Sequence, residues 1–152
     1  MRMRSSLALL FAALTAFPAL VAHAGGSEDA GDYMIHYNAL PTDQLAPAVA
    51  SAYGVVRSRN RALLNIAVTR KQDGSTGIPV EARVNVDAAN LSGQVKNVRV
   101  RKVTEEGEPQ AIYYIAEINV ADGETLIFDV KVTPEDRTQT HTVHFKQQFY
   151  AN

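Results

Sequence analysis

Histidine and methionine are the residues of this sequence whose types best suit a metal site. Beyond the first 24 residues they are Met34, His36, His141 and His144, and such side chains bind copper or zinc. His141 and His144 are three residues apart, which in a strand puts them on opposite faces of the sheet. Met34 and His36 share a face, but a metal carrier would need a third ligand such as His144. The sequence therefore predicts no metal site and no cofactor, with a copper or zinc carrier as an alternative function.

Arginine side chains are grouped in a way that suits the binding of anions. Five of them alternate with other residues in two segments, as Arg57, Arg59 and Arg61 and as Arg99 and Arg101. On one face of a sheet they would form a groove for carboxylate or phosphate groups, which guanidinium groups bind through paired hydrogen bonds. The alternative interpretation is structural, with cross-strand ion pairs to Glu81, Glu117 or Asp129.

Two adjacent tyrosines, Tyr113 and Tyr114, lie in the middle of an alternating apolar segment. Neighbouring side chains of a strand face opposite sides, so only one of the two can point into the core. Ile112 has the parity of Tyr114, which we therefore place in the core. Tyr113 and Ile115 then share the other face. They form either a contact patch for a partner or a surface packed under a helix formed by residues 47–53.

Motifs of hydrolases and nucleotide-binding enzymes are absent from the sequence. It contains no Gly-x-Ser-x-Gly segment and no glycine-rich phosphate loop, and its serines are scattered. Asn90-Leu91-Ser92 matches the glycosylation pattern, but we interpret it as a turn. We predict that the protein is not an enzyme.

The first 24 residues have the three parts of a secretory signal peptide. Arg2 and Arg4 precede an apolar segment, residues 7–20, and Ala22-His23-Ala24 follows with the small residues of a cleavage site. The apolar segment is shorter than the roughly 20 residues of a membrane span. We predict cleavage after Ala24, the alternative being an uncleaved anchor, and no membrane span in the processed chain.

Cleavage would leave 128 of the 152 residues, enough for one domain with its own core. The chain has no cysteine, which excludes disulfides and thiolate metal sites. Without Arg2 and Arg4 the charged residues number 13 basic against 16 acidic. A net charge of −3 argues against a general nucleic-acid-binding protein.

Hydrophobic alternation predicts the fold class. Period-two patterns cover seven segments: 32–38, 61–71, 80–86, 98–101, 111–120, 126–132 and 138–150. Pro47 and Gly54 delimit the short helix at residues 47–53. We predict an all-β, immunoglobulin-like antiparallel β-sandwich of about seven strands with this one helix. A closed barrel is the main alternative. Residues 25–31 are expected to be a flexible tail, and residues 32–150 a single domain.

Several short motifs resemble those of an uncharacterised family of exported proteins of Gram-negative proteobacteria, a domain of unknown function about as long as this chain. They are His36-Tyr37-Asn38-Ala39, Leu45 to Tyr53, Arg57-Ser58 with Arg61, Leu64-Asn65-Ile66, and Ala111 to Ala116. The resemblance implies a periplasmic, sandwich-like protein and implies no activity. Its polar positions here, His36, Tyr37, Asn38, Arg57, Arg61 and Asn65, either form a shared site or support the loop of residues 39–60.

These observations predict a non-enzymatic periplasmic binding or accessory module that contacts a protein or an anionic ligand through a sheet face. The candidate ligand-binding residues are His36, Asn38, Arg57, Arg61, Asn65 and Tyr113. The metal carrier is the first alternative. The second is an enzyme that uses His36 with Asn38 or Asn65.

Overall fold

The computed structural model describes residues 25–151, so the predicted signal peptide at residues 1–24 lies outside the described part. That part contains nine strands, and one short 3-10 helix and one α-helix lie between the second and third of them. The strands are β1 (Gly26–Ala30), β2 (Tyr33–Pro41), β3 (Arg61–Arg70), β4 (Ile78–Pro79), β5 (Ala82–Asn90), β6 (Arg101–Glu105), β7 (Ala111–Asn119), β8 (Thr125–Pro134) and β9 (His141–Gln148). The helices are η1 (Thr42–Gln44) and α1 (Pro47–Tyr53). None of these helices is long and apolar enough to cross a membrane.

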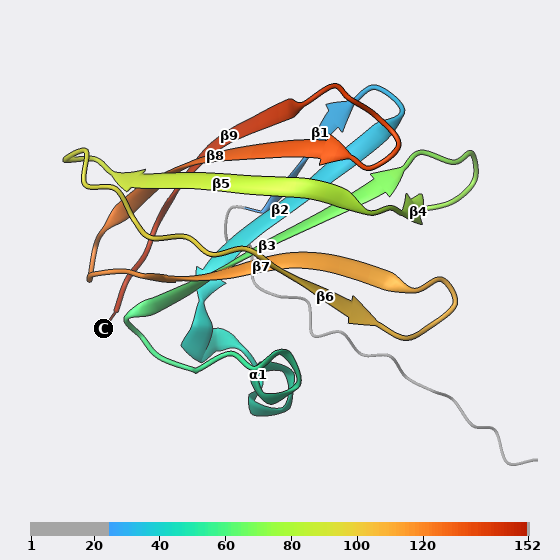
Figure 1. Cartoon of the computed structure of the whole chain (residues 1–152). Helices are drawn as coiled ribbons and strands as arrows, with labels where there is room; N and C mark the ends of the chain where they lie inside the picture. Colours follow the sequence, from blue (N-terminus) through green and yellow to red (C-terminus); the bar gives the residue numbers. More distant parts are fainter. Residues whose placement is uncertain (1–24, 152) are drawn as a thin grey trace, which may run out of the picture.

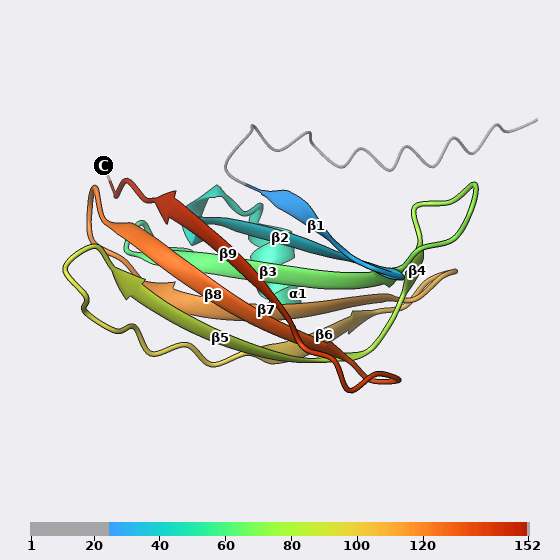
Figure 2. The ribbon, with the colours of Figure 1, turned by 90° about the horizontal axis from the view of Figure 1, so that it is seen from above.

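The strands form two separate antiparallel sheets (Figure 1). One has six strands in the order β1-β2-β3-β7-β6, with β4 added beside β3, and the other has three in the order β5-β8-β9. Figure 2 shows the two sheets lying over each other as layers. The predicted all-β antiparallel sandwich is confirmed, and the strands do not close into one barrel.

Two predicted segments need correction. Residues 26–30, predicted as part of a flexible tail, form β1, which pairs with β2 over five residue pairs. Their composition carries no strand signal, and the pairing arises because the edge of β2 offers unpaired backbone groups. The strand predicted at residues 98–101 begins only at Arg101 and continues to Glu105. With β1 and the short β4, the described chain has nine strands instead of about seven.

The main core lies between the two sheets and is built from alternate residues of both. Its largest fully buried side chains include Phe128, Phe149, Ile35, Leu64 and Ile66. Tyr37, Phe145 and Phe128 form a stack across the layers, with ring centroids 4.6 and 4.7 Å apart. Tyr114 points inward as predicted, and its hydroxyl accepts a 2.7 Å hydrogen bond from the amide of Ala82.

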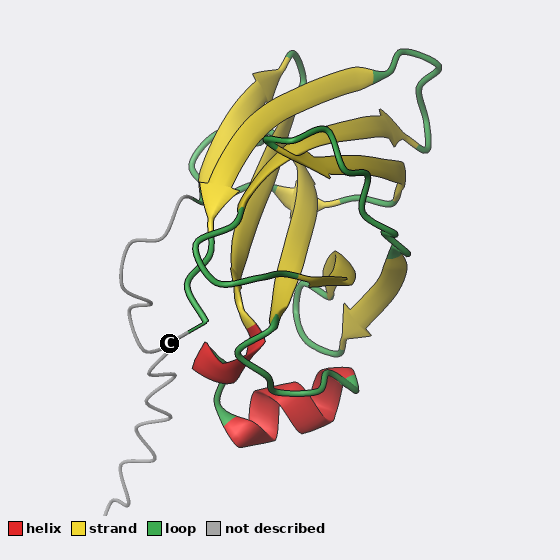
Figure 3. Ribbon diagram, turned by 90° about the vertical axis from the view of Figure 1, so that its left-hand side faces the viewer, coloured by secondary structure: helices red, strands yellow, loops and turns green. Residues whose placement is uncertain are grey.

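A second, smaller core lies on the outer face of the six-stranded sheet, the face turned away from the other sheet. It contains the buried residues Leu40, Ala50, Val55, Leu63 and Ile115, with Leu45, Tyr53, Val103 and Tyr113 packed against it. The helix covers it on one side of the strands (Figure 3). Residues 47–53 are helical as predicted, and Gly54 ends the helix in the left-handed conformation with φ of 64°. Tyr113 is therefore packed under α1, the second of the two interpretations given above.

Candidate functional site

Three of the predicted site residues, His36, Asn38 and Asn65, lie together on the outer face of the six-stranded sheet. His36 and Asn38 occupy alternate positions of β2, and Asn65 of β3 stands directly opposite Asn38. The Nε2 atom of His36 is 3.1 Å from the hydroxyl oxygen of Thr69. These side chains therefore form a polar strip that runs beside the helix-covered core.

The two predicted arginines form contacts elsewhere: Arg57 holds the loop of residues 42–60, and Arg61 of β3 pairs with Glu117 of β7. Arg57 donates a 2.8 Å hydrogen bond from Nη2 to the carbonyl oxygen of Asp43. Arg61 forms an ion pair with Glu117, with 3.2 Å between Nη1 and Oε2. Glu117 is one of the partners that the sequence suggested. The Arg57 contact agrees with the interpretation that this position supports the loop, and the Arg61 contact agrees with the interpretation of a cross-strand ion pair.

Tyr113 faces the helix, with its ring centroid 6.4 Å from that of Tyr53. Burial raises the pKa of the Tyr113 hydroxyl, and the Glu105 carboxylate raises it further. Tyr53 donates its own hydroxyl proton to Glu105, and Arg101 donates to the carbonyl oxygen of Tyr53. These contacts fasten α1 to β6 and β7, so Tyr113 belongs to the packing of the helix.

The histidines of β9 diverge as the sequence predicted. His144 lies on the outer face of the three-stranded sheet, where its Nδ1 contacts the carboxylate of Asp129. It is therefore on the other sheet from Met34 and His36 and cannot be their third ligand. Within residues 25–151 no group of three or more His, Cys, Asp or Glu side chains could hold a metal ion.

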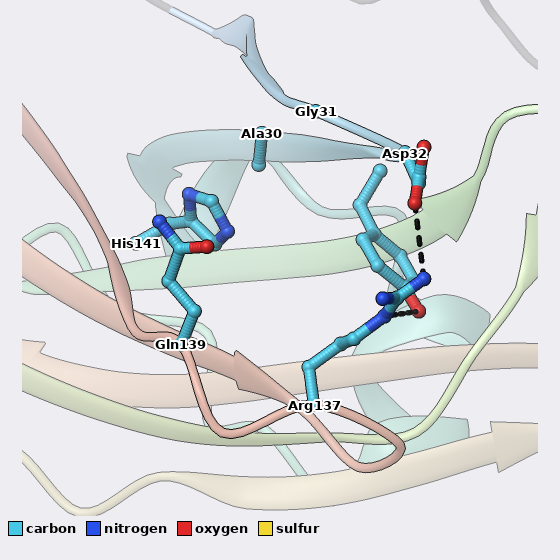
Figure 4. A pocket seen from close by; sticks show the side chains of 7 residues that line it. Ala30, Gly31, Asp32, Arg137, Gln139 and His141 are labelled. Carbon is cyan, nitrogen blue, oxygen red and sulfur yellow. Dashed lines mark hydrogen bonds and ion pairs between the residues drawn. The ribbon is translucent and has the colours of Figure 1, made fainter.

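A pocket of about 370 Å³ lies at one end of the sandwich. It is lined by Ala30, Gly31, Asp32, Tyr33, Arg137, Gln139 and His141. These residues come from the turn between β1 and β2 and from the segment that leads into β9. Figure 4 shows Gln139 and His141 on one side of the pocket and Arg137 on the other.

Tyr33 forms the fixed wall of this pocket. It is only 3% exposed, and its hydroxyl donates a 2.6 Å hydrogen bond to Asp136 Oδ1. The Nε of Arg137 donates to the same hydroxyl oxygen at 3.4 Å, and its Nη2 lies 3.0 Å from Asp32 Oδ2. The guanidinium carbons of Arg70 and Arg137 lie 5.9 and 5.8 Å from the centre of the Tyr33 ring.

These contacts hold the charged groups in their ionised forms. The hydrogen bond from Tyr33 lowers the pKa of the Asp136 carboxyl, and the guanidinium of Arg70 lowers it further. The hydrogen bond to Tyr33 also raises the pKa of Arg137, and the Asp32 carboxylate raises it further. Asp32 and Arg137 line the pocket itself, whereas Arg70 and Asp136 contact Tyr33 and line a neighbouring pocket.

Three polar groups around the pocket are available to a ligand. Among residues 25–151, the Gln139 amide, the His141 ring and the Nη1 of Arg137 have no hydrogen-bond partner. Gln139 and His141 lie on one side of the pocket and Arg137 on the other, so a ligand between them can contact all three. Together they can donate several hydrogen bonds to one small polar ligand.

Sequence reasoning missed this pocket, although one signal pointed to it. Gln139 and His141 have the same parity as Val143 and Phe145, whose side chains face the core. Polar residues that continue an inward-facing parity past the end of a core lie at the rim of the sandwich. Arg137 extends the same series by one more step.

Comparison with known proteins identifies the family. The profile of a domain of unknown function, DUF4426, matches residues 27–152. A crystal structure of a DUF4426 family protein from Pseudomonas aeruginosa PAO1 is similar to this chain, with 34% identity and a TM-score of 0.68. The similarity covers 83% of this chain and 94% of that one. No curated protein matches. The chain therefore belongs to the DUF4426 family, whose function is uncharacterised.

Proposed function

We propose that this protein is an exported, non-enzymatic binding module that takes a small monocarboxylate in the pocket between the β1–β2 turn and the segment before β9. The observation that carries the proposal is that the side chains of Gln139 and His141, which have no hydrogen-bond partner among the described residues, line one pocket together with the Nη1 edge of Arg137. Export rests on the signal-peptide pattern of residues 1–24.

The size and chemistry of the pocket support a small organic ligand. Its volume of about 370 Å³ is in the range of ligand pockets, about 300–1,000 Å³. The Nη1 of Arg137 can donate to a carboxylate oxygen, as guanidinium groups do in charge-assisted pairs. Gln139 and His141 can bind the second carboxylate oxygen or a neighbouring polar atom of the ligand.

The charge balance favours a single negative charge. The guanidinium groups of Arg70 and Arg137 are already paired with Asp136 and Asp32. The site has little positive excess, so phosphate or a polycarboxylate would meet the repulsion of these carboxylates. We place the ligand here because the side chains of Gln139 and His141 line this pocket beside Arg137 and have no hydrogen-bond partner among the described residues.

The test is a titration of the isotopically labelled protein with a panel of small monocarboxylates, their uncharged amides, and inorganic phosphate. We expect the backbone and side-chain NMR signals of Gln139 and His141 to shift when a monocarboxylate is added. The uncharged amide ligands and inorganic phosphate should shift these signals much less. Gln139→Ala and His141→Ala should each weaken binding about tenfold, the effect of losing roughly 1.4 kcal/mol. His144→Ala is the matched control, because that histidine lies on the outer face of the three-stranded sheet.

Two results would overturn this proposal. One is the absence of signal changes around the pocket with every carboxylate at millimolar concentration. The other is equal binding by the native protein and by both pocket variants.

A further inference from the structure

The pocket at the end of the sandwich, called the end pocket below, contains a charged group that carboxylate binding does not use. Asp32 lines this pocket together with Arg137, and 3.0 Å separates Asp32 Oδ2 from Arg137 Nη2. The second carboxylate oxygen, Oδ1, has no hydrogen-bond partner within residues 25–151. The Asp32 side chain is 72% exposed, so this oxygen is accessible to a ligand.

The turn between β1 and β2 fixes the position of Asp32. Gly31, the residue before it, has the left-handed φ of 72° that favours glycine, and its amide donates a 3.0 Å hydrogen bond to Asp29 Oδ1. The carbonyl oxygen of Asp32 accepts a 2.8 Å hydrogen bond from the amide of Lys71. The ion pair with Arg137 then orients the carboxylate. Because the group is already in place, a ligand can bind it with little loss of side-chain freedom.

The end pocket therefore presents a free donor beside a free acceptor of opposite charge. The donor is Arg137 Nη1 and the acceptor is Asp32 Oδ1, and the dashed line between the two side chains in Figure 4 marks the ion pair that joins them. A ligand can contact both free atoms without breaking that ion pair. A simple carboxylate bound to Nη1 would be repelled by the Asp32 carboxylate. An ammonium group on the same ligand would instead be attracted to it, and it carries three donors.

We infer that the end pocket binds the zwitterion of a small α-amino acid, whose carboxylate accepts from Arg137 Nη1 and whose ammonium group donates to Asp32 Oδ1. The inference rests on the proposed carboxylate site and names the class of its ligand. The two charged groups of an α-amino acid are attached to one carbon atom, so a single small ligand presents both to neighbouring side chains. Gln139 and His141 lie across the pocket, where they can contact the rest of the ligand.

The test compares three ligands that share one carbon skeleton. Alanine carries both charges, propionate carries only the carboxylate, and alaninamide carries only the ammonium group. Each is titrated into the isotopically labelled protein at pH 7 and low ionic strength, where ion pairs are least screened. We expect alanine to bind about fivefold more tightly than propionate, as for one exposed ion pair. Alaninamide should also bind more weakly than alanine.

The variant Asp32→Asn keeps the size of the side chain and removes its charge. It should abolish the preference for alanine over propionate, while propionate binds as tightly as to the native protein or more tightly. Asp87→Asn is the matched control, because Asp87 is also 72% exposed and is paired with a basic residue, Lys131. Asp87 lies on β5, outside the end pocket, so its substitution should leave the preference unchanged.

The outcomes separate this inference from the proposed function. Propionate binding that equals or exceeds alanine binding in the native protein overturns the amino-acid inference and leaves the carboxylate site standing. The inference is also overturned if alaninamide binds as tightly as alanine, if the preference persists in Asp32→Asn, or if Asp87→Asn reduces it equally. If neither alanine nor any simple monocarboxylate binds at millimolar concentration, the carboxylate site itself is refuted, and the inference with it.

Discussion

Tyr33 and Asp136 lie 103 residues apart in the chain and share a 2.6 Å hydrogen bond at one end of the sandwich. Tyr33 begins β2 in the six-stranded sheet, and Asp136 follows β8 of the three-stranded sheet. The bond therefore ties the two layers together where the pocket opens. Because Arg70 and Arg137 also contact Tyr33, the wall of the pocket is held in place from several elements.

The phenylalanine variant of Tyr33 tests this tie. Tyr33→Phe keeps the buried ring and removes the hydroxyl that bonds Asp136 and Arg137. We expect Tm to fall by about 3–5 °C, as for the loss of one hydrogen bond from a domain of this size. Tyr150→Phe is the matched control, since its hydroxyl bonds only Gln148 and the side chain is 59% exposed. Equal effects of the two substitutions would contradict the role given to Tyr33.

The ion pair between Lys96 and Glu124 should make stability depend on pH. Their side chains are 15% and 11% exposed, with 2.7 Å between Nζ and Oε1. Burial alone raises the pKa of Glu124, but hydrogen bonds from Lys96, the Ala121 amide and Asn90 outweigh it, and the net pKa is lowered. The carboxylate therefore stabilises the fold fully above its unfolded-state pKa, and this contribution is lost as pH falls through the folded-state value.

Glu124→Gln should cost about 3 kcal/mol at pH 7, because the Lys96 ammonium is left buried without its partner. The native protein should lose stability between about pH 5 and pH 3, and the variant should lose less over that window. Urea unfolding at both pH values measures this difference. Glu81→Gln provides the control, because its pair with Lys102 is solvent-exposed. Identical acid sensitivity of native protein and Glu124→Gln would refute the assignment.

The hydroxyl of Thr42 should control the order of the loop that follows α1. Thr42 is fully buried, and its Oγ1 lies 2.9 and 3.0 Å from the carbonyl oxygens of Val56 and Ser58. The amide of Ser58 donates to the same atom at 2.8 Å. Thr42→Val keeps the shape and leaves these groups unpaired, at a cost of about 1–3 kcal/mol.

Hydrogen exchange is the sharpest readout of that substitution. The Ser58 amide should exchange faster in Thr42→Val, while the amides of β8 keep their relative protection. Thr104→Val is a suitable control, because that threonine is exposed on β6. Unchanged exchange at Ser58 would show that the loop does not depend on this hydroxyl.

The small core under α1 should contribute to global stability. Ile115 is 1% exposed and packs against this cluster, whereas Ile127 on β8 is 42% exposed. Ile115→Ala should cost about 2–5 kcal/mol through lost burial and a cavity. Ile127→Ala should cost less than about 1 kcal/mol. Denaturant midpoints of both variants give the comparison, and equal costs would mean that α1 is not anchored by this core.

Much of the fold could be predicted because strands with one buried face alternate apolar and polar residues. Segments such as Leu64 to Val68 and Leu126 to Val132 show this pattern, and both are strands. The prediction failed at Gly26–Ala30, whose side chains carry no apolar alternation. That strand exists because β2 exposes an edge beside it, and such an edge belongs to the folded sheet.

The candidate site was predicted less well than the fold. The common face of His36 and Asn38 and the ion pair of Arg61 with Glu117 follow from strand periodicity and pairing, which local reasoning captures. The end pocket does not, because Asp32 and Tyr33 reach Arg137 only when the β1–β2 turn meets the loop after β8. A contact between residues more than a hundred positions apart leaves no local pattern in the sequence.

The amino-acid sequence by itself determined the class of the fold, the inward position of Tyr114 and the helix between Pro47 and Gly54, because these depend on the alternation of side chains and on local backbone preferences. Only the tertiary structure decided which polar residues meet. The stacking of two sheets brought Arg137, Gln139 and His141 to the wall built on Tyr33, and strand register set Asn38 against Asn65. Such meetings depend on how separate strands are aligned in space, and that alignment arises only when the whole core packs.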